Sequence, residues 1–315
     1  MKELKVGVVG IGHLGIYHLE KYSKIKNCTI GGVVDIDRAR AENAAARFGC
    51  EAFTDHRDLV GVVDAVSVTT PTVSHHAVAI DFLDAGVDVL VEKPMTLTLE
   101  EADDLVAAAR RGGRMLQVGF VERFNPAVMA LREIMGPPLF IEAHRLHPFH
   151  SRGTDVDVVL DLMIHDLDLI LASVKSPVET IDAVGVSVLS DKVDIANVRI
   201  AFESGCVANI TASRITGKKM QKIRFFGLDG YHSLDYAKRE LVSLEKVAGP
   251  NGETDIGMRD VTLKQHDPLE EEIRHFVDSV ASRTVPLVSG EEGRKSLELA
   301  LRVIQCMKRG RSHGE

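Results

Sequence analysis

The fold is decided by a stretch near the N-terminus, which reads Lys5-Val6-Gly7-Val8-Val9-Gly10-Ile11-Gly12-His13-Leu14-Gly15. A Val-rich run ends in glycines spaced G-x-G-x-x-G, and residues 16–24 continue as the start of a helix. Gly10 permits a sharp turn, Gly12 lets the backbone approach a pyrophosphate, and Gly15 lets the helix sit close to the strand. The N-terminus of that helix offers free N–H groups to phosphates. The stretch therefore predicts a strand, a tight turn and a helix that together bind a dinucleotide.

In such a strand-turn-helix unit, a carboxylate after the second strand contacts the adenosine ribose. The apolar run 29–34 ends in Asp35, about twenty residues beyond the last glycine of the turn. Asp35 would accept hydrogen bonds from the ribose hydroxyls and repel a 2′-phosphate, which favours NAD over NADP, although Arg38 lies close enough to soften that preference. The alternative is that Asp35 caps a helix over 38–48, a role that Asp37 could fill instead.

Composition bounds the class of protein. The chain has 315 residues, enough for two domains, with 45% hydrophobic and 27% charged residues and a formal net charge of -8. This negative net charge does not indicate a nucleic-acid partner, which a strongly basic chain would. The four cysteines, at positions 28, 50, 206 and 306, show no C-x-x-C spacing, which predicts reduced thiols and no metal site. No signal peptide or membrane-spanning run is evident, so we expect a cytoplasmic protein without a membrane partner.

Strands and helices alternate as far as Gly119. Apolar strands are expected at 65–68, 87–91 and 115–118, with helices at 73–85 and 98–110. Thr98 and Glu101 are spaced as a capping box at the start of the second helix. Alternating units with fully apolar strands indicate a parallel sheet covered on both faces. The prediction is an α/β domain over residues 1–120, doubly wound and nucleotide-binding.

The pattern changes after residue 120. Asn125-Pro126 is typical of a helix cap and first turn, and 157–174 is expected to be a helix. A strand is expected at 139–146, then alternation with a period of two at 198–202, 206–211 and 223–225, with a hairpin turn at 203–205. This predicts an antiparallel sheet with one face on helices and an apolar second face that can pack on another subunit. Two helices, 268–282 and 291–308, close the chain after a Gly-rich loop at 247–260.

In a doubly wound sheet the ligand lies at the carboxyl ends of the strands. Three stretches fall there, Thr69-Thr70-Pro71, Glu92-Lys93-Pro94 and Gly119-Phe120, with His75 and His76 starting a helix nearby. Pro94 restricts Lys93 to an extended conformation. Lys93 could then reach a nicotinamide ring or the hydroxyl being oxidised, and the alternative is a surface lysine in a loop. His13 lies inside the glycine turn, where a place beside the cofactor or in solvent suits it better than catalysis.

Asp161 and His165 lie four residues apart, so on a helix they share one face, which their apolar neighbours predict to be partly buried. The carboxylate can fix the tautomer of His165 and stabilise the imidazolium, which makes a good general base. Two alternatives stay open: a satisfied pair in the core, or half of a metal site together with Asp168. The metal site is the weaker alternative, because no further cluster of ligands is evident.

A group of basic side chains lies near the expected cleft. Arg123 follows the last strand of the first domain, and Arg145, His147 and Arg152 lie between Leu139, where the next strand begins, and the helix that carries Asp161. Such a cluster could bind a substrate phosphate. The alternative is a solvated, charged loop.

Together these motifs resemble the Gfo/Idh/MocA oxidoreductase family, and the resemblance covers nearly the whole chain. The matching motifs are Gly10-x-Gly12-x-x-Gly15, Asp35, Thr70-Pro71 with His75, Glu92-Lys93-Pro94, Arg123-Phe124-x-Pro126 and Asp161-x-x-x-His165-x-x-Asp168. The resemblance implies a Rossmann domain followed by an α/β domain over 121–315 with a large, mostly antiparallel sheet, which binds substrate and forms a homodimer or homotetramer. It also implies NAD(P)-dependent oxidation or reduction of sugars and related alcohols.

The resemblance also assigns roles to residues. Lys93 and His165 match the catalytic pair of the family, with Asp161 close by. The expected cofactor contacts are Gly10, Gly12, His13, Leu14, Gly15, Asp35, Thr70, Pro71, His75, Glu92 and Lys93. The expected substrate contacts are Arg123, Asn125, Arg145, His147 and His165. Met163 stands where many members have Gly, and Val158-Val159 stand where a glycine pair is usual, so these departures bear on the substrate more than on the reaction.

Within the family, the stretches 121–126, 145–149 and 153–166 look like members that oxidise the 3-hydroxyl of UDP-N-acetylglucosamine for the diamino sugar of some lipid A molecules. His165 is then expected to accept the hydroxyl proton while Lys93 hydrogen-bonds the developing alkoxide, and the two could exchange roles. One alternative is a dehydrogenase of a free sugar or inositol-like polyol. Another is an NAD-binding regulator without turnover, although such members typically lack the lysine or the histidine.

Overall fold

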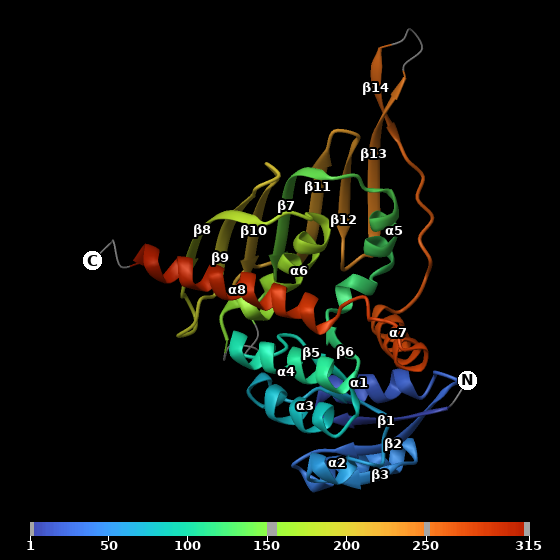
Figure 1. Cartoon of the computed structure of the whole chain (residues 1–315). Helices are drawn as coiled ribbons and strands as arrows, with labels where there is room; N and C mark the ends of the chain where they lie inside the picture. Colours follow the sequence, from blue (N-terminus) through green and yellow to red (C-terminus); the bar gives the residue numbers. More distant parts are fainter. Residues whose placement is uncertain (1–2, 150–155, 249–252, 312–315) are drawn as a thin grey trace. The chain divides into compact units, whose positions relative to one another are not determined.

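The computed structural model of the chain describes residues 3–149, 156–248 and 253–311. These form two compact units, each of which takes two stretches of chain (Figure 1). The first unit holds Met1–Phe124 and His266–Arg294, and the second holds Asn125–Gln265 and Lys295–Glu315. The sequence, in contrast, predicts a single boundary at residue 120.

The first unit is built on a six-stranded sheet in the order β3-β2-β1-β4-β5-β6, with every pair parallel. The strands are β1 (Leu4–Val9), β2 (Cys28–Val34), β3 (Glu51–Phe53), β4 (Ala65–Val68), β5 (Asp88–Glu92) and β6 (Leu116–Gly119). Every residue of β4 and β5 is buried, as expected for central strands of a parallel sheet that is covered on both faces. The predicted doubly wound Rossmann sheet is confirmed. The sequence missed β3, whose three residues are exposed or half-buried and form no apolar run.

Helices cover both faces of this sheet because right-handed crossovers run outward in both directions from β1. The helices are α1 (His13–Tyr22), α2 (Arg38–Phe48), α3 (His75–Asp84), α4 (Leu99–Gly112) and α7 (Pro268–Ser282). One core joins β1 and β2 to Leu19 of α1, Ala44 of α2 and Phe276 of α7, and α3 packs beside α4. The predicted capping box of Thr98 and Glu101 is present at the start of α4. The closing helix α7 therefore completes the first unit.

The second unit is built on an eight-stranded sheet in the order β14-β13-β12-β11-β7-β10-β9-β8. The strands are β7 (Pro138–Leu146), β8 (Val178–Val186), β9 (Ile195–Phe202), β10 (Val207–Ser213), β11 (Met220–Gly227), β12 (Gly230–Asp235), β13 (Glu240–Ala248) and β14 (Thr254–Met258). All pairs are antiparallel except β7 with β10. The mostly antiparallel sheet expected from the sequence is confirmed.

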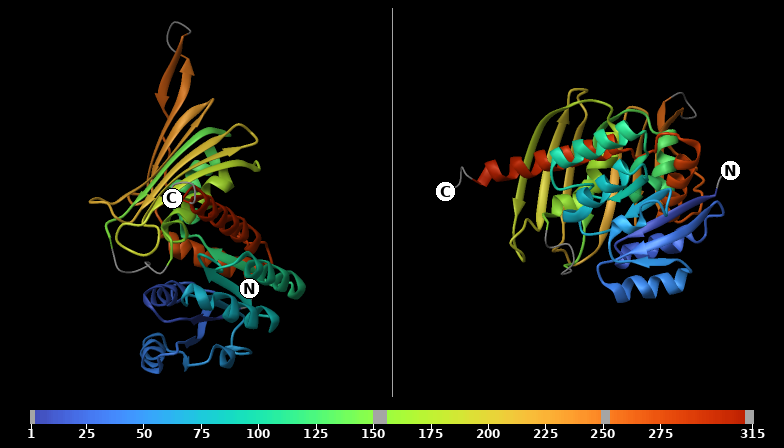
Figure 2. Two further views of the ribbon diagram at one scale, coloured as in Figure 1. Left: turned by 90° about the vertical axis from the view of Figure 1, so that its left-hand side faces the viewer. Right: turned by 60° about the horizontal axis from the view of Figure 1, so that its bottom comes forward.

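One face of the second sheet carries the core of this unit. Val198, Ile200 and Phe202 of β9 alternate toward that face and are fully buried, as their spacing predicts. The helices of the unit are α5 (Pro126–Ile134), α6 (Ile164–Ser173) and α8 (Gly290–Arg311), which begins in the stretch assigned to the first unit. The left view of Figure 2 shows α6 and α8 along this same face. Asn125 caps α5 and Pro126 forms its first turn, as predicted.

One local prediction in this unit is wrong, and a second is right in its helix but not in the form of the first turn. Residues 247–260 do not form a loop throughout, because the end of β13 pairs with β14 in a hairpin that extends past the neighbouring strands (Figure 1). Only two apolar residues, Ile256 and Met258, alternate in β14, which is too weak a signal to predict a strand. The helix expected over 157–174 begins instead with a π-helical turn, η4 (Val159–Met163), before α6.

Candidate active site

The glycine turn lies at the switch point of the first sheet, where the order of strands reverses between β1 and β4. Gly10 has φ of +93°, and a Cβ there would lie 2.7 Å from the backbone nitrogen of Thr70. A Cβ on Gly15 would lie 2.1 Å from the carbonyl oxygen of Gly10. Each of these two positions therefore requires glycine for the fold itself.

Gly12 differs from the other two glycines because nothing lies within 4 Å of the place its Cβ would take. It is the N-cap of α1, without a side-chain cap, and the first turn of that helix contains no acidic residue. The first N–H groups of α1 thus donate no hydrogen bond to an N-cap side chain, and no acidic residue of that helical turn repels an anion. His13 is exposed and lies edge-on to Tyr17, with ring centroids 4.6 Å apart. This cradle fits the pyrophosphate of a dinucleotide.

Asp35 follows β2 and its side chain is almost fully buried. Its carboxylate accepts hydrogen bonds from the backbone nitrogens of Ile11 at 2.8 Å and Asp37 at 2.9 Å. Asp37, not Asp35, caps α2, so the alternative of a cap at Asp35 is excluded. The guanidinium beside Asp35 belongs to Arg40, at 3.3 Å, a residue that no sequence pattern singles out. Arg38, which we expected there, is exposed and pairs with Glu42 at 3.6 Å.

The loop after β4 carries a polar group that suits a ligand. Thr70 Oγ1 is buried and has no hydrogen-bond partner among the described residues, and such a group is costly to leave unpaired. Pro71 beside it is exposed. The ring of His75 is buried, with one nitrogen 2.9 Å from the Thr70 carbonyl oxygen and the other 3.0 Å from that of Pro94. Burial lowers the pKa of His75. Its ring therefore joins the loops after β4 and β5.

Glu92 and Lys93 lie at the end of β5. The Glu92 carboxylate is almost fully buried and lies 3.1 Å from Nε2 of His18, in the middle of α1. A Cβ on Gly119, at the end of β6, would lie 2.6 Å from Glu92 Oε1, so the carboxylate packs against this glycine. Lys93 is half-buried. No signal in the sequence indicates that His18 contacts this motif.

In the second unit, Asp161 lies in the π-helical turn η4 and His165 in the first turn of α6, and both are half-buried, as the sequence predicts. A π-helical turn is rare and occurs often at functional sites. Asp168 is fully buried and accepts a hydrogen bond from Ser296 of α8 at 3.0 Å. Among the described residues no three His, Cys, Asp or Glu side chains form a group that could hold a metal ion.

The other residues expected to contact substrate have contacts within their own units. Arg145 forms a two-point ion pair with Asp166, at 2.8 and 3.0 Å, and its guanidinium lies 4.7 Å from the centre of the Tyr236 ring. Asn125 accepts from the backbone of α5 and donates to the Tyr236 carbonyl at 3.2 Å.

The remaining members of that group differ in their surroundings. Arg123 is almost fully buried and lies 3.7 Å from Glu292. His147 is half-buried, with a ring nitrogen 2.7 Å from the amide nitrogen of Gln221. Arg152 and positions 153–155 of the matching stretch lie outside the described residues.

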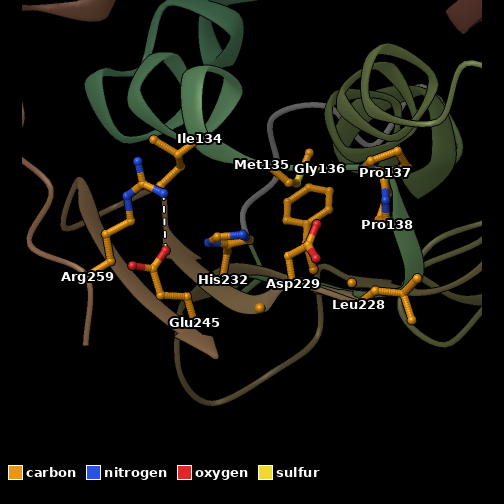
Figure 3. A pocket seen from close by; sticks show the side chains of 13 residues that line it. Ile134, Met135, Gly136, Pro137, Pro138, Leu228, Asp229, His232, Glu245 and Arg259 are labelled. Atoms are coloured by element: carbon orange, nitrogen blue, oxygen red, sulfur yellow. Dashed lines mark hydrogen bonds and ion pairs between the residues drawn. The ribbon is translucent and has the colours of Figure 1, made fainter. Parts of the chain in front are cut away.

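A pocket in the second unit lies between the end of α5 and strands β11 to β13 (Figure 3). His232 is on its wall, beside an ion pair of Arg259 with Glu245 at 3.2 Å, and burial lowers the pKa of His232. None of the residues predicted for catalysis, cofactor or substrate is among the thirteen that line this pocket.

The fold and the glycine turn define a class of protein, and comparison with known families agrees. Residues 4–120 match a model described as "Oxidoreductase family, NAD-binding Rossmann fold", and residues 134–232 match the "GFO/IDH/MocA C-terminal domain". The chain belongs to the Gfo/Idh/MocA oxidoreductase family. It is an NAD(P)-dependent oxidoreductase that acts on CH–OH groups.

Individual relatives extend over the full length of the chain. A UDP-N-acetylglucosamine 3-dehydrogenase of Acidithiobacillus ferrooxidans is 40% identical over 306 residues, which cover 96% of this chain and 97% of that one. A solved structure of the enzyme so named from that organism superimposes with a TM-score of 0.90 at 37% identity, covering 98% and 99% of the two chains. A myo-inositol 2-dehydrogenase of Thermotoga maritima is 28% identical, covering 98% of each chain.

No helix within the described part of the chain has both the length and the apolar character needed to cross a bilayer.

Proposed function

We propose that the chain is a dehydrogenase that oxidises the 3-hydroxyl of UDP-N-acetylglucosamine, or of a related UDP-amino sugar, to a ketone. The observation that carries this proposal is the 40% identity, over almost the whole of both chains, to a relative of that name. The stretches that suggested the same substrate class from sequence include the π-helical turn and the start of α6. A role in lipid A biosynthesis would follow, with an aminotransferase consuming the ketone.

NAD is the cofactor that we propose. The first turn of α1, which has no side-chain cap, the open space at Gly12 and the buried hydroxyl of Thr70 support binding of a dinucleotide at the switch point. The Asp35 carboxylate at the end of β2 supports NAD over NADP, because a 2′-phosphate there would be repelled. The guanidinium of Arg40, whose side chain is 51% exposed, is the positive charge beside Asp35.

The proposed chemistry assigns one role to each residue. Bound NAD supplies the acceptor for the hydride that leaves the sugar carbon. His165 accepts the hydroxyl proton, and Asp161 orients the His165 imidazole. Lys93 donates a hydrogen bond to the developing alkoxide and so stabilises its charge in the transition state. Neither a polyol nor an amino sugar changes these roles, so they hold for both candidate substrates.

Substitution tests these assignments. We expect His165→Ala to lower kcat about a hundredfold to ten-thousandfold, because a general base contributes that much. NAD affinity should change little, since the proposed cofactor contacts all belong to the first unit. His76→Ala is a matched control, because His76 is partly exposed and pairs with Asp104 at 2.9 Å. Near-normal turnover by His165→Ala would exclude His165 as the base.

A second candidate function is oxidation of a free inositol-like polyol, which the relative of that name at 28% identity favours. A panel of UDP-N-acetylglucosamine, UDP-glucose, free N-acetylglucosamine and myo-inositol, followed at the NADH absorbance, separates the two. The same panel tests the alternative that the chain is an NAD-binding regulator without turnover. Tight binding of NAD with no turnover of any sugar would support that alternative.

We also propose a cytoplasmic location. The free thiols of all four cysteines support a reducing compartment such as the cytoplasm.

We further propose that the protein forms a homodimer or homotetramer through the open face of the second sheet. A row of apolar side chains crosses six neighbouring strands on that face, through Val207, Phe140, Phe226, Tyr231, Leu244 and Met258. The three aromatic rings of the row have centroids 5.4 and 5.0 Å apart in order along it. All six residues are exposed or half-buried in the single chain. A continuous apolar row of this kind is typical of a surface that a second subunit covers.

A further inference from the structure

Four polar side chains form a buried chain of hydrogen bonds in the first unit. The Tyr22 hydroxyl lies 2.7 Å from Ser67 Oγ, which lies 3.1 Å from Nδ1 of His18, and Nε2 of His18 lies 3.1 Å from Glu92 Oε1. Tyr22, His18 and Ser67 are fully buried, and Glu92 is 9% exposed. The chain links α1 and β4 to the end of β5. Because buried polar groups are costly unless paired, these contacts hold one another in a single arrangement.

The direction of the hydrogen bonds follows from counting hydrogens. Burial raises the pKa of Tyr22, so its phenol keeps its proton, and Ser67 is its one hydrogen-bond partner among the described residues. Tyr22 therefore donates to Ser67, Ser67 donates to Nδ1 of His18, and Nε2–H of His18 donates to Glu92. A neutral His18 gives every polar hydrogen an acceptor. A protonated ring would donate from both nitrogens and leave one buried hydroxyl hydrogen without an acceptor.

This chain of hydrogen bonds ends at Glu92, the residue before Lys93. The Glu92 carboxylate is held between Nε2 of His18 and the backbone of Gly119, where no Cβ would fit. On the other side of Lys93, the carbonyl oxygen of Pro94 lies 3.0 Å from a ring nitrogen of His75. The second ring nitrogen of His75 lies 2.9 Å from the Thr70 carbonyl. Buried histidine rings therefore lie against both residues that flank Lys93, and the single N–H of a neutral His75 donates to the Pro94 or to the Thr70 carbonyl oxygen.

We propose that His18, supported by Ser67 and Tyr22, and His75 are positioning residues that fix Lys93 for catalysis. The inference rests on the proposed role of Lys93. Small misplacements of a catalytic group cost large factors in rate, so an anchor on each flanking residue has a direct use. His18 also lies in the helix whose first turn forms the phosphate cradle, so one helix supports both the cofactor turn and the lysine loop.

The variants differ in how many hydrogen bonds they remove from this buried chain of hydrogen bonds. We expect His18→Ala to lower kcat about tenfold to a hundredfold, with the KM values for NAD and sugar changing less than about threefold. Glu92→Gln keeps the size of the side chain and one acceptor, so it fits beside Gly119 and should fold; we expect a loss of about tenfold in kcat. Tyr22→Phe removes only the last donor and should cost less than either. His76→Ala, at a partly exposed position of α3, is the control that leaves all values unchanged.

Two readouts do not depend on turnover. Amide hydrogen exchange at Lys93 and Met95 should be faster in His18→Ala and in His75→Ala than in the wild type, and unchanged in His76→Ala. The ¹⁵N shifts of His18 in the wild type should show a neutral ring protonated at Nε2. These measurements decide the inference even if the wild type oxidises no UDP-sugar, a result that would instead refute the proposed function.

Three results would overturn the inference. The first is exchange at Lys93 and Met95 that stays at the wild-type rate in both histidine variants. The second is a rise in the KM for NAD as large as the loss in kcat, which would indicate general damage to the unit. The third is a His18 ring protonated at Nδ1. If His18→Ala does not fold, Glu92→Gln carries the same comparison.

Discussion

At the scale of single residues, the glycine turn separates two requirements that the sequence motif combines. Gly10 and Gly15 have no room for a Cβ, because backbone atoms of the turn and of the loop after β4 lie within 3 Å of its place. Gly12 has open space at the same point, so the folded chain alone does not require a glycine there. The close approach of a pyrophosphate is the remaining reason for it.

These two kinds of glycine predict opposite outcomes on substitution. Gly12→Ala should leave the melting temperature within about 2 °C of the wild type and weaken NAD binding by about tenfold or more, because the new methyl group meets the cofactor. Gly15→Ala should lower stability by about 1–3 kcal/mol or more through overpacking. Thermal unfolding and calorimetric titration with NAD measure both effects. Equal loss of stability in the two variants would contradict this distinction.

Cofactor preference is a second prediction at this scale. Asp35→Ser removes the negative charge near the expected ribose and should lower the ratio of kcat/KM for NAD to that for NADP by about tenfold or more. Asp37→Ser is the matched control, since serine keeps the cap of α2 and the charge of Asp35 remains. The ratio is measured with both cofactors at saturating sugar. An unchanged ratio in Asp35→Ser would show that Asp35 does not select the cofactor.

At the scale of elements, a buried ion pair ties α6 to β7. Arg145 and Asp166 have side chains that are 3% and 0% exposed and meet at two points. Asp166 directly follows His165, so the pair fixes the turn of α6 that carries the proposed base. The sequence suggested Arg145 as a contact for substrate phosphate, and its place in this pair instead supports a structural role.

Removing one partner leaves an uncompensated buried charge. Arg145→Met should therefore lower the free energy of unfolding by about 3–5 kcal/mol, and the double substitution Arg145→Met with Asp166→Leu should recover much of that loss. Urea denaturation measures both. In variants that remain folded, we expect no selective loss of activity on UDP-sugars relative to free sugars. A single-variant cost below about 1 kcal/mol would contradict the burial of the pair.

At the scale of the whole molecule, three buried or half-buried histidines make stability depend on pH. Burial lowers the pKa of His75, His232 and His275 below the ordinary 6.5. Below pH 6.5 the unfolded chain then binds more protons than the folded chain, so stability is full above that pH and falls as the pH decreases toward the folded-state pKa values.

Chemical denaturation between pH 7 and 5.5 should thus show a decreasing free energy of unfolding. Each group contributes at most about 1.4 kcal/mol per pH unit. His75→Asn should reduce the slope, because its side chain does not titrate in this window, while the partly exposed variant His76→Asn should not. Stability that rises toward pH 5.5, or a slope insensitive to His75, would contradict this sign of the pH dependence.

Assembly is also a property of the whole molecule. Phe226 lies at the middle of the apolar row on the second sheet, so Phe226→Asp should convert the assembled protein to a smaller species in sedimentation equilibrium. Val73→Asp, at a 71% exposed position of the first unit, is the control. A wild-type protein that stays monomeric at about 100 µM would exclude a stable subunit interface along this apolar row.

Sequence patterns predicted those parts of the molecule that local chemistry determines. The glycine turn, the caps at Asp37, Thr98 and Asn125, and the alternation in β9 each depend on neighbours in the chain, and each is confirmed. Contacts between distant residues left no such signal. His18 meets Glu92 across 74 positions, and Arg145 of β7 meets Asp166 of α6 across 21. The π-helical turn at Asp161 and the short strands β3 and β14 lack a pattern of their own.

We propose that this chain removes hydride from carbon 3 of a UDP-linked amino sugar. UDP-N-acetylglucosamine carrying deuterium at C3 tests it directly, with NAD present and the reduced cofactor analysed by mass spectrometry. We predict that the reduced cofactor gains one mass unit, and that substrate labelled at C4 gives none. Unlabelled reduced cofactor from the C3-labelled sugar, or no turnover of it while myo-inositol is oxidised, would contradict the claim.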